Sequence, residues 1–184
     1  MRLMLGVAFC LVLSLGVFGQ STNRQLAEDF TAITLAGQSV NLQQHRGKIV
    51  VLTFWSTRCA ICASEIPKLN KIADKYAGKD VVFYGLSVEN ETNITSYLKR
   101  KPFRFTVIPD SLGVVLKYAR KDNQGRITMG FPAIFVINQD GRIVLNASGY
   151  DKTGALDSQI SSLLISKEAE PVDNKKGGTP RCCN

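Results

Sequence analysis

The chain has 184 residues, of which 45% are hydrophobic and 21% are charged. This balance suits one globular domain and excludes a chain that is disordered throughout. The formal net charge is +8, and basic residues cluster at 99–104 and 117–126, so a nucleic-acid surface must be considered. Acids and turn-forming residues are mixed with these clusters. We therefore favour a solvated face, or attraction to an acidic partner or anionic lipid, over nucleic acid.

The N-terminus has the pattern of an export signal. An almost uncharged stretch from Leu3 to Gly19 follows Arg2 and ends in small residues before Gln20, as signal peptidase requires. We predict that residues 1–19 are a signal peptide and that the protein is periplasmic or secreted. The stretch is also at the lower limit for crossing a hydrocarbon core of about 30 Å, so a short membrane anchor is the alternative. Cys10 lies too early in it for a lipoprotein signal.

The first predicted elements after this signal are a hairpin, a strand and a helix. Phe30–Leu35 and Ser39–Leu42 are short runs rich in Thr, Ile, Val and Leu, which indicates a small β-hairpin. Lys48–Trp55 is almost continuously apolar and β-branched, which predicts a buried central strand. From Cys62 to Tyr76, apolar residues recur at steps of three and four, the spacing of one buried helical face.

The middle of the chain continues this alternation of strands and helices. Val81–Val88 is predicted to be a second buried strand, and Asn93–Lys99 a helix. Phe105–Ile108 is predicted to be a short extended segment, and Leu112–Ala119 another short helix. Such an order favours parallel strands joined by crossover helices.

The last part combines a hairpin with a closing helix. Ala133–Ile137 and Arg142–Ala147 flank a turn in which Gly141 supplies a positive φ, and a helix is predicted over Thr153–Ile165. The whole pattern predicts an α/β fold with a central mixed sheet, helices on both faces and an N-terminal β-hairpin. We assign the domain to residues 20–166 and predict a disordered tail over 167–184, where apolar side chains are scarce.

The cysteines carry the chemistry. Cys59 and Cys62 form a Cys-x-x-Cys where the predicted central strand meets a helix, so both sulfurs lie on one side, within bridging distance. Cys59 should face the unpaired N–H groups and positive end of that helix, and Arg58 adds a positive charge, so its thiolate should be favoured. Cys62 lies one turn further in. It should act second, resolving a mixed disulfide.

Two other interpretations of the cysteines stay open. The pair could be half of a zinc site completed by His45 or by Cys182 and Cys183, or it could be a permanent structural disulfide. His45 is the only histidine and lies in a polar loop, where we expect a solvated surface position.

The residues around the dithiol resemble those of the thioredoxin superfamily, and in particular its TlpA/ResA-like extracytoplasmic branch with a redoxin or AhpC/TSA-like domain. Phe54-Trp55 precedes the cysteines, Glu65-Ile66-Pro67 follows them, and Gly130-Phe131-Pro132-Ala133 lies before a second strand. The resemblance covers about Leu26 to Ile165. It implies a thioredoxin-like fold in which Pro132 is cis and packs against the dithiol, while the Phe131 backbone pairs with an extended substrate.

The same resemblance assigns roles to further residues. Glu65 matches a glutamate that tunes the cysteines and accepts protons, with an exposed helix carboxylate as the alternative. Pro67 should kink the helix. Trp55 is expected to pack beneath the site or to be an ordinary core aromatic, and with Arg58, Phe131 and Pro132 it completes the expected substrate-binding set.

Three positions depart from the family pattern. Arg58 stands where tryptophan is usual, which makes the rim of the site more cationic. Thr53 replaces the buried acid of cytoplasmic thioredoxins and leaves proton transfer to Glu65 or water. Ala60 and Ile61 carry no charge between the cysteines, unlike the histidine of strongly oxidising relatives, which favours a reductant.

The resemblance implies a thiol:disulfide oxidoreductase that reduces disulfides of exported proteins, apocytochrome c among them. Electrons would come from a membrane thiol carrier of the DsbD or CcdA type, with no cofactor or metal beyond the Cys59–Cys62 dithiol. One alternative is a peroxiredoxin-like peroxidase, although Leu52 and Ser56 stand where that family has proline and threonine. The other is a copper carrier, which would need a histidine facing the dithiol.

Overall fold

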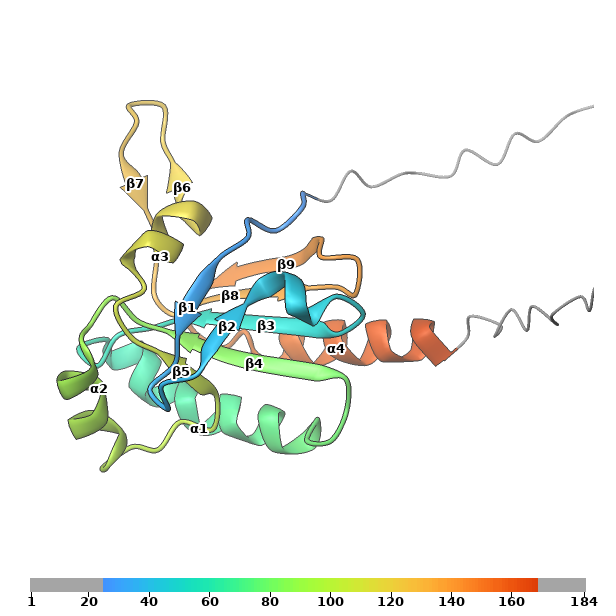
Figure 1. Cartoon of the computed structure of the whole chain (residues 1–184), viewed down its shortest axis with the longest axis horizontal. Helices are drawn as coiled ribbons and strands as arrows, with labels where there is room; N and C mark the ends of the chain where they lie inside the picture. The colour runs from blue at the N-terminus through green and yellow to red at the C-terminus, as the bar shows by residue number, and fades with distance from the viewer. Residues whose placement is uncertain (1–24, 169–184) are drawn as a thin grey trace, which may run out of the picture.

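The computed structural model describes residues 25–168, and Figure 1 shows how they are arranged. One five-stranded sheet has the order β5-β4-β3-β8-β9. β3 is parallel to β4 and β4 to β5, whereas β8 is antiparallel to both β3 and β9. The predicted mixed sheet is therefore confirmed. Its strands are β3 (Ile49–Phe54), β4 (Val81–Leu86), β5 (Thr106–Ile108), β8 (Ala133–Ile137) and β9 (Ile143–Ser148).

Helices cover both faces of this sheet, as the sequence predicts. One face packs against α1 (Ala60–Lys75), α2 (Glu91–Leu98) and α4 (Thr153–Glu168). The other packs against α3 (Leu112–Tyr118) and η1 (Leu42–His45). The predicted N-terminal hairpin, formed by β1 (Thr31–Ile33) and β2 (Ser39–Asn41), lies on this second face.

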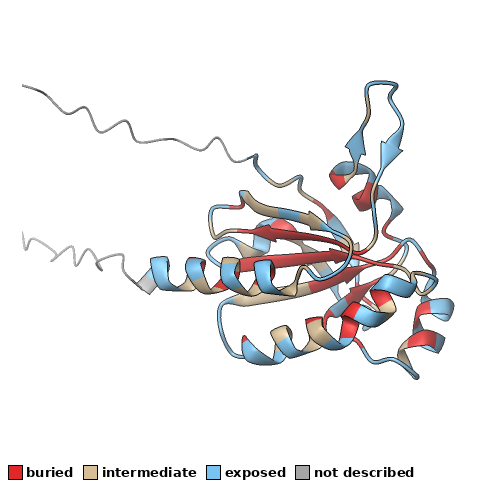
Figure 2. Cartoon of the chain, turned by 180° about the vertical axis from the view of Figure 1, so that it is seen from behind, coloured by how far each residue is buried: buried red, intermediate tan, exposed pale blue. Residues whose placement is uncertain are grey.

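β3 is the centre of the core. All six of its residues are buried, and Figure 2 shows the burial concentrated in the central strands. Because strand side chains alternate, Ile49 and Val51 pack with α1 and α4, whereas Val50 and Leu52 pack with η1 and α3. A strand buried on both faces is rigid, so its carboxyl end gives the following residues a fixed starting point.

Helix α1 begins at Ala60, two residues before the predicted start. Apolar periodicity begins only at Cys62, but the helix is capped earlier, because the Cys59 sulfur accepts the Cys62 N–H at 3.1 Å. Pro67 lies inside α1, as predicted. α4 extends to Glu168, past the predicted domain end at residue 166. The predicted signal at 1–19 and the rest of the predicted tail, with Cys182 and Cys183, lie outside the described residues.

A second hairpin is absent from the sequence prediction. β6 (Arg120–Lys121) and β7 (Ile127–Thr128) pair antiparallel and project from the domain as an arm between α3 and Pro132. All four strand residues are exposed. The arm buries no apolar face, so it has none of the alternation that marks a half-buried strand, and the sequence shows only a basic cluster there.

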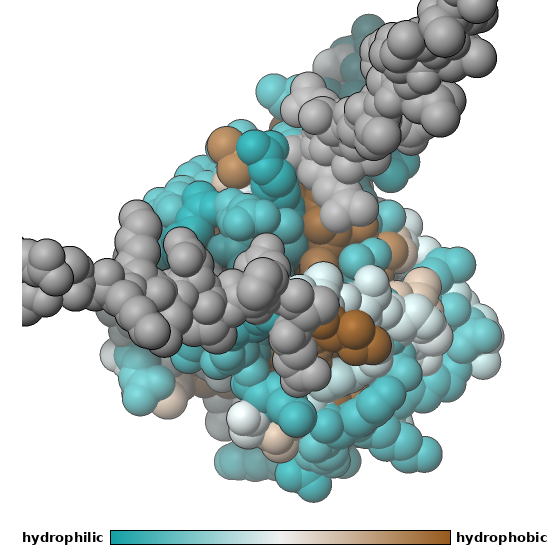
Figure 3. Space-filling view, turned by 90° about the vertical axis from the view of Figure 1, so that its right-hand side faces the viewer, coloured by the Kyte–Doolittle hydropathy of each residue, from teal (hydrophilic) through white to brown (hydrophobic). Residues whose placement is uncertain are grey.

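The end of the domain opposite the start of β8 is mostly hydrophilic. Figure 3 shows this end with apolar residues in small, separate groups among hydrophilic ones. Within residues 25–168, no helix has both the length and the hydropathy needed to cross a bilayer.

Candidate active site at the start of helix α1

Cys59 and Cys62 lie where the carboxyl end of β3 passes into α1, and they are joined in a disulfide. Their Cα atoms are 5.2 Å apart. Cys62 is only 1% exposed, whereas Cys59 is partly exposed. As predicted, Cys59 is the outer sulfur and Cys62 the shielded one. An incoming sulfur atom can reach Cys59 but not Cys62.

The helix start provides a defined electrostatic contact for Cys59. The Cys62 N–H, one of the unpaired donors of the first helical turn, points at the Cys59 sulfur. A negative sulfur accepts such a hydrogen bond more strongly than a neutral one and lies at the positive end of the helix dipole. The capping geometry thus favours the thiolate form of Cys59 once the disulfide is reduced.

The loop before β8 lies against the same sulfur. The Phe131–Pro132 peptide bond is cis, as the family resemblance implies. The Cys59 sulfur is 3.7 Å from the Phe131 carbonyl oxygen, and the Pro132 carbonyl accepts the Gly149 N–H at 2.9 Å. This contact with Gly149 ties the loop to the end of β9. The cis-proline loop and the dithiol therefore form one surface from residues 72 positions apart in the chain.

Glu65 is buried, with 2% of the residue exposed. The alternative of an exposed helix carboxylate is therefore wrong. Its carboxylate accepts a hydrogen bond from Lys68 Nζ at 2.9 Å, and this bond raises the Lys68 pKa. Lys68 also lies over the Tyr150 ring and 3.6 Å from Asp151. Glu65 is one helical turn from Cys62, and its role in proton transfer stays a prediction.

Trp55 packs beneath the dithiol. It is 1% exposed, and its ring centroid lies 5.5 Å from those of Tyr97 and Phe103. This burial corrects its place among the substrate-binding residues, because a client at the surface does not reach it. Thr53, where cytoplasmic thioredoxins have an acid, is completely buried. The core below the cysteines contains no carboxylate at that position.

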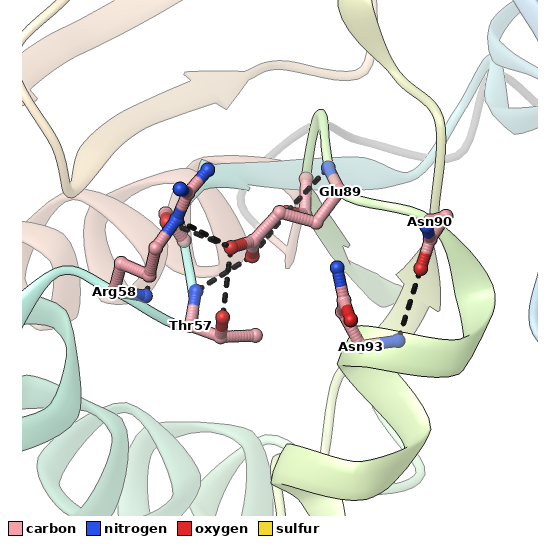
Figure 4. A network of polar contacts seen from close by, with 7 residues as sticks. Thr57, Arg58, Glu89, Asn90 and Asn93 are labelled. Carbon is pink, nitrogen blue, oxygen red and sulfur yellow. Dashed lines mark hydrogen bonds and ion pairs between the residues drawn. The ribbon is translucent and has the colours of Figure 1, made fainter.

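The sequence analysis did not identify Glu89, which has the densest set of polar contacts beside the dithiol (Figure 4). It lies just after β4 and is 7% exposed. Its carboxylate accepts from the Thr57 N–H and hydroxyl, both at 2.7 Å, and from the hydroxyls of Ser56 and Ser87. Burial opposes its ionisation, but these hydrogen bonds outweigh burial and hold its pKa below the ordinary value.

Arg58 is paired with this same carboxylate. Its side chain is 87% exposed, and its Nε lies 3.5 Å from Glu89 Oε1. The sequence analysis treats Arg58 as a full positive charge beside Cys59. The structure corrects this expectation, because a neighbouring negative charge offsets that of Arg58.

No group of three or more His, Cys, Asp or Glu side chains that could hold a metal ion occurs within residues 25–168. His45, the histidine of the zinc and copper alternatives, bonds to the Tyr84 hydroxyl at 2.7 Å. It is half-buried rather than solvated. Burial, and then the charge of Lys48, lowers its pKa.

Comparison with known proteins gives the family. Residues 24–146 match the AhpC/TSA family. The chain belongs to this family. ResA of Bacillus thuringiensis subsp. konkukian (strain 97-27), named a thiol-disulfide oxidoreductase, is 28% identical over 138 residues, which cover 74% of this chain and 76% of that protein.

The chain is also similar to solved structures of disulfide-exchange proteins. A putative thiol:disulfide interchange protein DsbE from Chlorobium tepidum matches with a TM-score of 0.62 and 25% identity, over 77% of this chain and 96% of that one. A secreted Mycobacterium tuberculosis disulfide oxidoreductase homologous to E. coli DsbE matches with a TM-score of 0.57 and 25% identity, over 73% and 96%. The predicted thioredoxin-like fold and thiol:disulfide oxidoreductase class are confirmed.

Proposed function

We propose that the protein is an extracytoplasmic thiol:disulfide oxidoreductase that reduces disulfides in exported proteins. The observation that carries this proposal is the disulfide between an accessible, helix-capping Cys59 and a shielded Cys62, beside a cis-proline loop. The similarity to ResA and to a secreted relative of DsbE supports the class and the location. Apocytochrome c is the client class that the family resemblance suggests.

The reaction proceeds in two thiol–disulfide exchanges. The Cys59 thiolate attacks one sulfur of the client disulfide and releases the other as a thiolate, leaving Cys59 joined to the client. Cys62 then loses its proton and attacks the Cys59 sulfur, which releases the second client thiolate and forms the Cys59–Cys62 disulfide. Two electrons pass to the client. We infer that Glu65, one turn from Cys62, takes the Cys62 proton.

The client is held at the cis-proline loop. An extended client segment pairs with the backbone of Phe131, beside the Cys59 sulfur. Ile61, between the cysteines, is 42% exposed and adds an apolar contact at the rim. A cleft of about 180 Å³ begins at this loop and is lined by Met129, Gly130 and Ser148 among others. Neither cysteine lines this cleft, so it would take client side chains beyond the reacting sulfurs.

Re-reduction of the dithiol requires electrons from outside the chain. We propose a membrane thiol carrier of the DsbD or CcdA type as the donor, and no bound cofactor beyond the dithiol. An exported protein with residues 1–19 as its signal would meet such a carrier at the membrane surface. The uncharged Ala60-Ile61 pair between the cysteines supports the direction of a reductant.

The function can be tested with protein that lacks only the predicted signal, residues 1–19, and in which Cys182→Ser and Cys183→Ser remove the tail thiols. This protein should reduce insulin with turnover in dithiothreitol. Cys59→Ser should abolish turnover, and Cys62→Ser should accumulate mixed disulfides that mass spectrometry detects. Ser64→Ala, on the exposed side of α1, is the matched control and should keep full activity.

Two results would contradict the proposal. Rapid consumption of hydrogen peroxide, without any mixed disulfide in Cys62→Ser, would favour the peroxidase alternative. Against that alternative, the position where peroxiredoxins have proline is here Leu52, which is fully buried in β3. A pair that stays joined in every redox buffer would be a structural disulfide. The copper alternative lacks its histidine at the dithiol, because His45 bonds to Tyr84.

A further inference from the structure

Glu89 is held rigidly at the end of β4. Its backbone N–H donates to the Ser87 hydroxyl at 3.2 Å, and its carbonyl accepts the Asp110 N–H at 3.0 Å. Its backbone N–H and its carbonyl are therefore both held, independently of the contacts that its carboxylate makes. A carboxylate fixed in this way provides a rigid acceptor for the loop that faces it.

The loop facing Glu89 leads directly to the nucleophile. Four hydrogen bonds reach the carboxylate, and three of them come from Ser56 and Thr57. The Cys59 N–H in turn donates to the Ser56 carbonyl at 3.2 Å. The position of the Cys59 backbone thus depends on the Ser56–Thr57 segment, and that segment depends on Glu89. Figure 4 shows the contacts between Thr57 and Glu89.

A carboxylate accepts all four of these hydrogen bonds at once. Both Glu89 oxygens accept, Oε1 from Thr57 and Ser56 and Oε2 from Thr57 and Ser87. A glutamine keeps this pattern only if its NH₂ group takes the Oε1 position and the Ser56 and Thr57 hydroxyls turn to accept from it. Two other groups sense the same charge. Arg58 Nε lies 3.5 Å from Oε1. The Tyr97 pKa on α2 is raised, chiefly by burial; the charge of Arg100 lowers it and the charge of Glu89 raises it.

We propose that Glu89 is a positioning residue of the dithiol site, which fixes the Ser56–Arg58 loop ahead of Cys59 and offsets the positive charge of Arg58 beside it. The consequence is electrostatic. Without Glu89, the charge of Arg58 would act undiminished near Cys59, stabilise its thiolate and make the disulfide a stronger oxidant. With Glu89, the site stays reducing. This inference rests on the proposed function and names the group that sets its direction.

The first test compares Glu89→Gln with the parent protein. The pH dependence of Cys59 alkylation by iodoacetamide gives the thiol pKa. Glu89→Gln should lower that pKa by about 0.5 to 1 unit, the size of effect expected from one nearby charge. It should also shift the equilibrium with glutathione toward reduced protein, because a more stable thiolate makes the disulfide easier to reduce.

A double-mutant cycle separates this role from simple support of the loop. Arg58→Gln alone should raise the Cys59 pKa by about 0.5 to 1 unit, because the negative charge of Glu89 is then unopposed. The double variant should return close to the parent pKa, because both charges are removed. Thr57→Val keeps both charges and removes one hydrogen bond. It should leave the pKa unchanged while lowering kcat/KM for insulin.

Each of three outcomes would overturn the inference. A double variant whose Cys59 pKa stays as low as that of Glu89→Gln would mean that the two charges do not oppose each other at Cys59. No shift in either single variant would make Glu89 a structural residue only. If Glu89→Gln does not fold, Arg58→Gln decides alone, and an unchanged Cys59 pKa would show that the charge of Arg58 does not act at Cys59, so that Glu89 has nothing to offset. Alkylation needs no client, so the two tests are independent. The inference about Glu89 can fail while insulin reduction succeeds, and insulin reduction can fail while the inference about Glu89 holds.

Discussion

Gly85 on β4 lies against the aromatic residues that support the dithiol. A Cβ atom at Gly85 would lie 2.8 Å from Phe103 Cε1 and 3.2 Å from Trp55 Nε1. Gly85→Ala therefore forces both rings to move. We expect a loss of about 1–3 kcal/mol in the free energy of unfolding, the usual effect of overpacking a core, measured by urea denaturation.

Gly113 in α3 provides the matched control for this substitution. A Cβ atom there meets no atom within 4 Å, and alanine favours a helix over glycine by about 1 kcal/mol. Gly113→Ala should thus leave stability unchanged or raise it. Equal destabilisation by both variants would show that the contacts of Gly85 with Trp55 and Phe103 are not the cause.

Glu65 is the second residue whose contribution can be measured. Its buried carboxylate lies one helical turn from Cys62, paired with Lys68. Removing a negative charge near a thiol lowers the thiol pKa, so Glu65→Gln should move Cys59 alkylation to lower pH by about 0.3–1 unit. Glu91→Gln, the same change at an exposed position, should leave the curve in place. An unchanged curve for Glu65→Gln would limit Glu65 to a structural ion pair.

At the scale of elements, the β6–β7 arm is separable from the core. Its strand residues are exposed, and they pair only with each other. Replacing Lys121–Ile127 by Asn-Gly should keep the fold and change the free energy of unfolding by less than about 1 kcal/mol, as expected for surface changes. Thermal unfolding monitored by circular dichroism measures this change.

Tyr118 is the contrasting case at the base of the arm. It is 6% exposed, and its hydroxyl donates to the Glu28 carbonyl at 2.8 Å. Tyr118→Ala should cost about 3–5 kcal/mol, the range for truncating a buried aromatic residue. If shortening the arm cost as much as Tyr118→Ala, the arm would be part of the cooperative core.

The elements differ in how much of them the sequence predicts. Both β3 and α1 could be located from the sequence because both are buried. Burial gives β3 a continuous apolar run, and it gives α1 apolar residues at steps of three and four. The arm could not, since no burial constrains its residues. Glu89 was missed for another reason. Its contacts depend on β3 and β4 lying in parallel, which brings residues 56–58 beside 87–89, and no local pattern records that pairing.

At the scale of the whole molecule, carboxylates with lowered pKa values determine the response to acid. Hydrogen bonds from Lys75 and then Tyr76 lower the Asp157 pKa, and burial opposes them. For Glu89, hydrogen bonds outweigh the larger single effect of burial. A lowered folded-state pKa means that each group stabilises the fold above its unfolded pKa. This contribution is lost as pH falls through the folded value.

Stability should accordingly begin to fall below pH 6.5, the unfolded pKa of His45, and fall further below the unfolded pKa values of 4.5 for Glu and 3.8 for Asp. Urea midpoints at pH 7, 5, 4 and 3 measure this. Asp157→Asn should be less stable at pH 7 and lose less on acidification than the parent. Parallel pH profiles for the two proteins would show that Asp157 does not contribute.

Both ends of the described domain lie away from the dithiol. Leu26 forms a β-bridge with Arg142, next to the β8–β9 turn, and Lys167 pairs with Asp80 at the start of β4, whereas Cys59 follows the carboxyl end of β3 (Figure 1). Immobilisation through either end would therefore leave the reactive sulfur facing the solution. A resin carrying Cys62→Ser protein could then capture clients covalently from an exported-protein extract, and a thiol wash would elute them for identification.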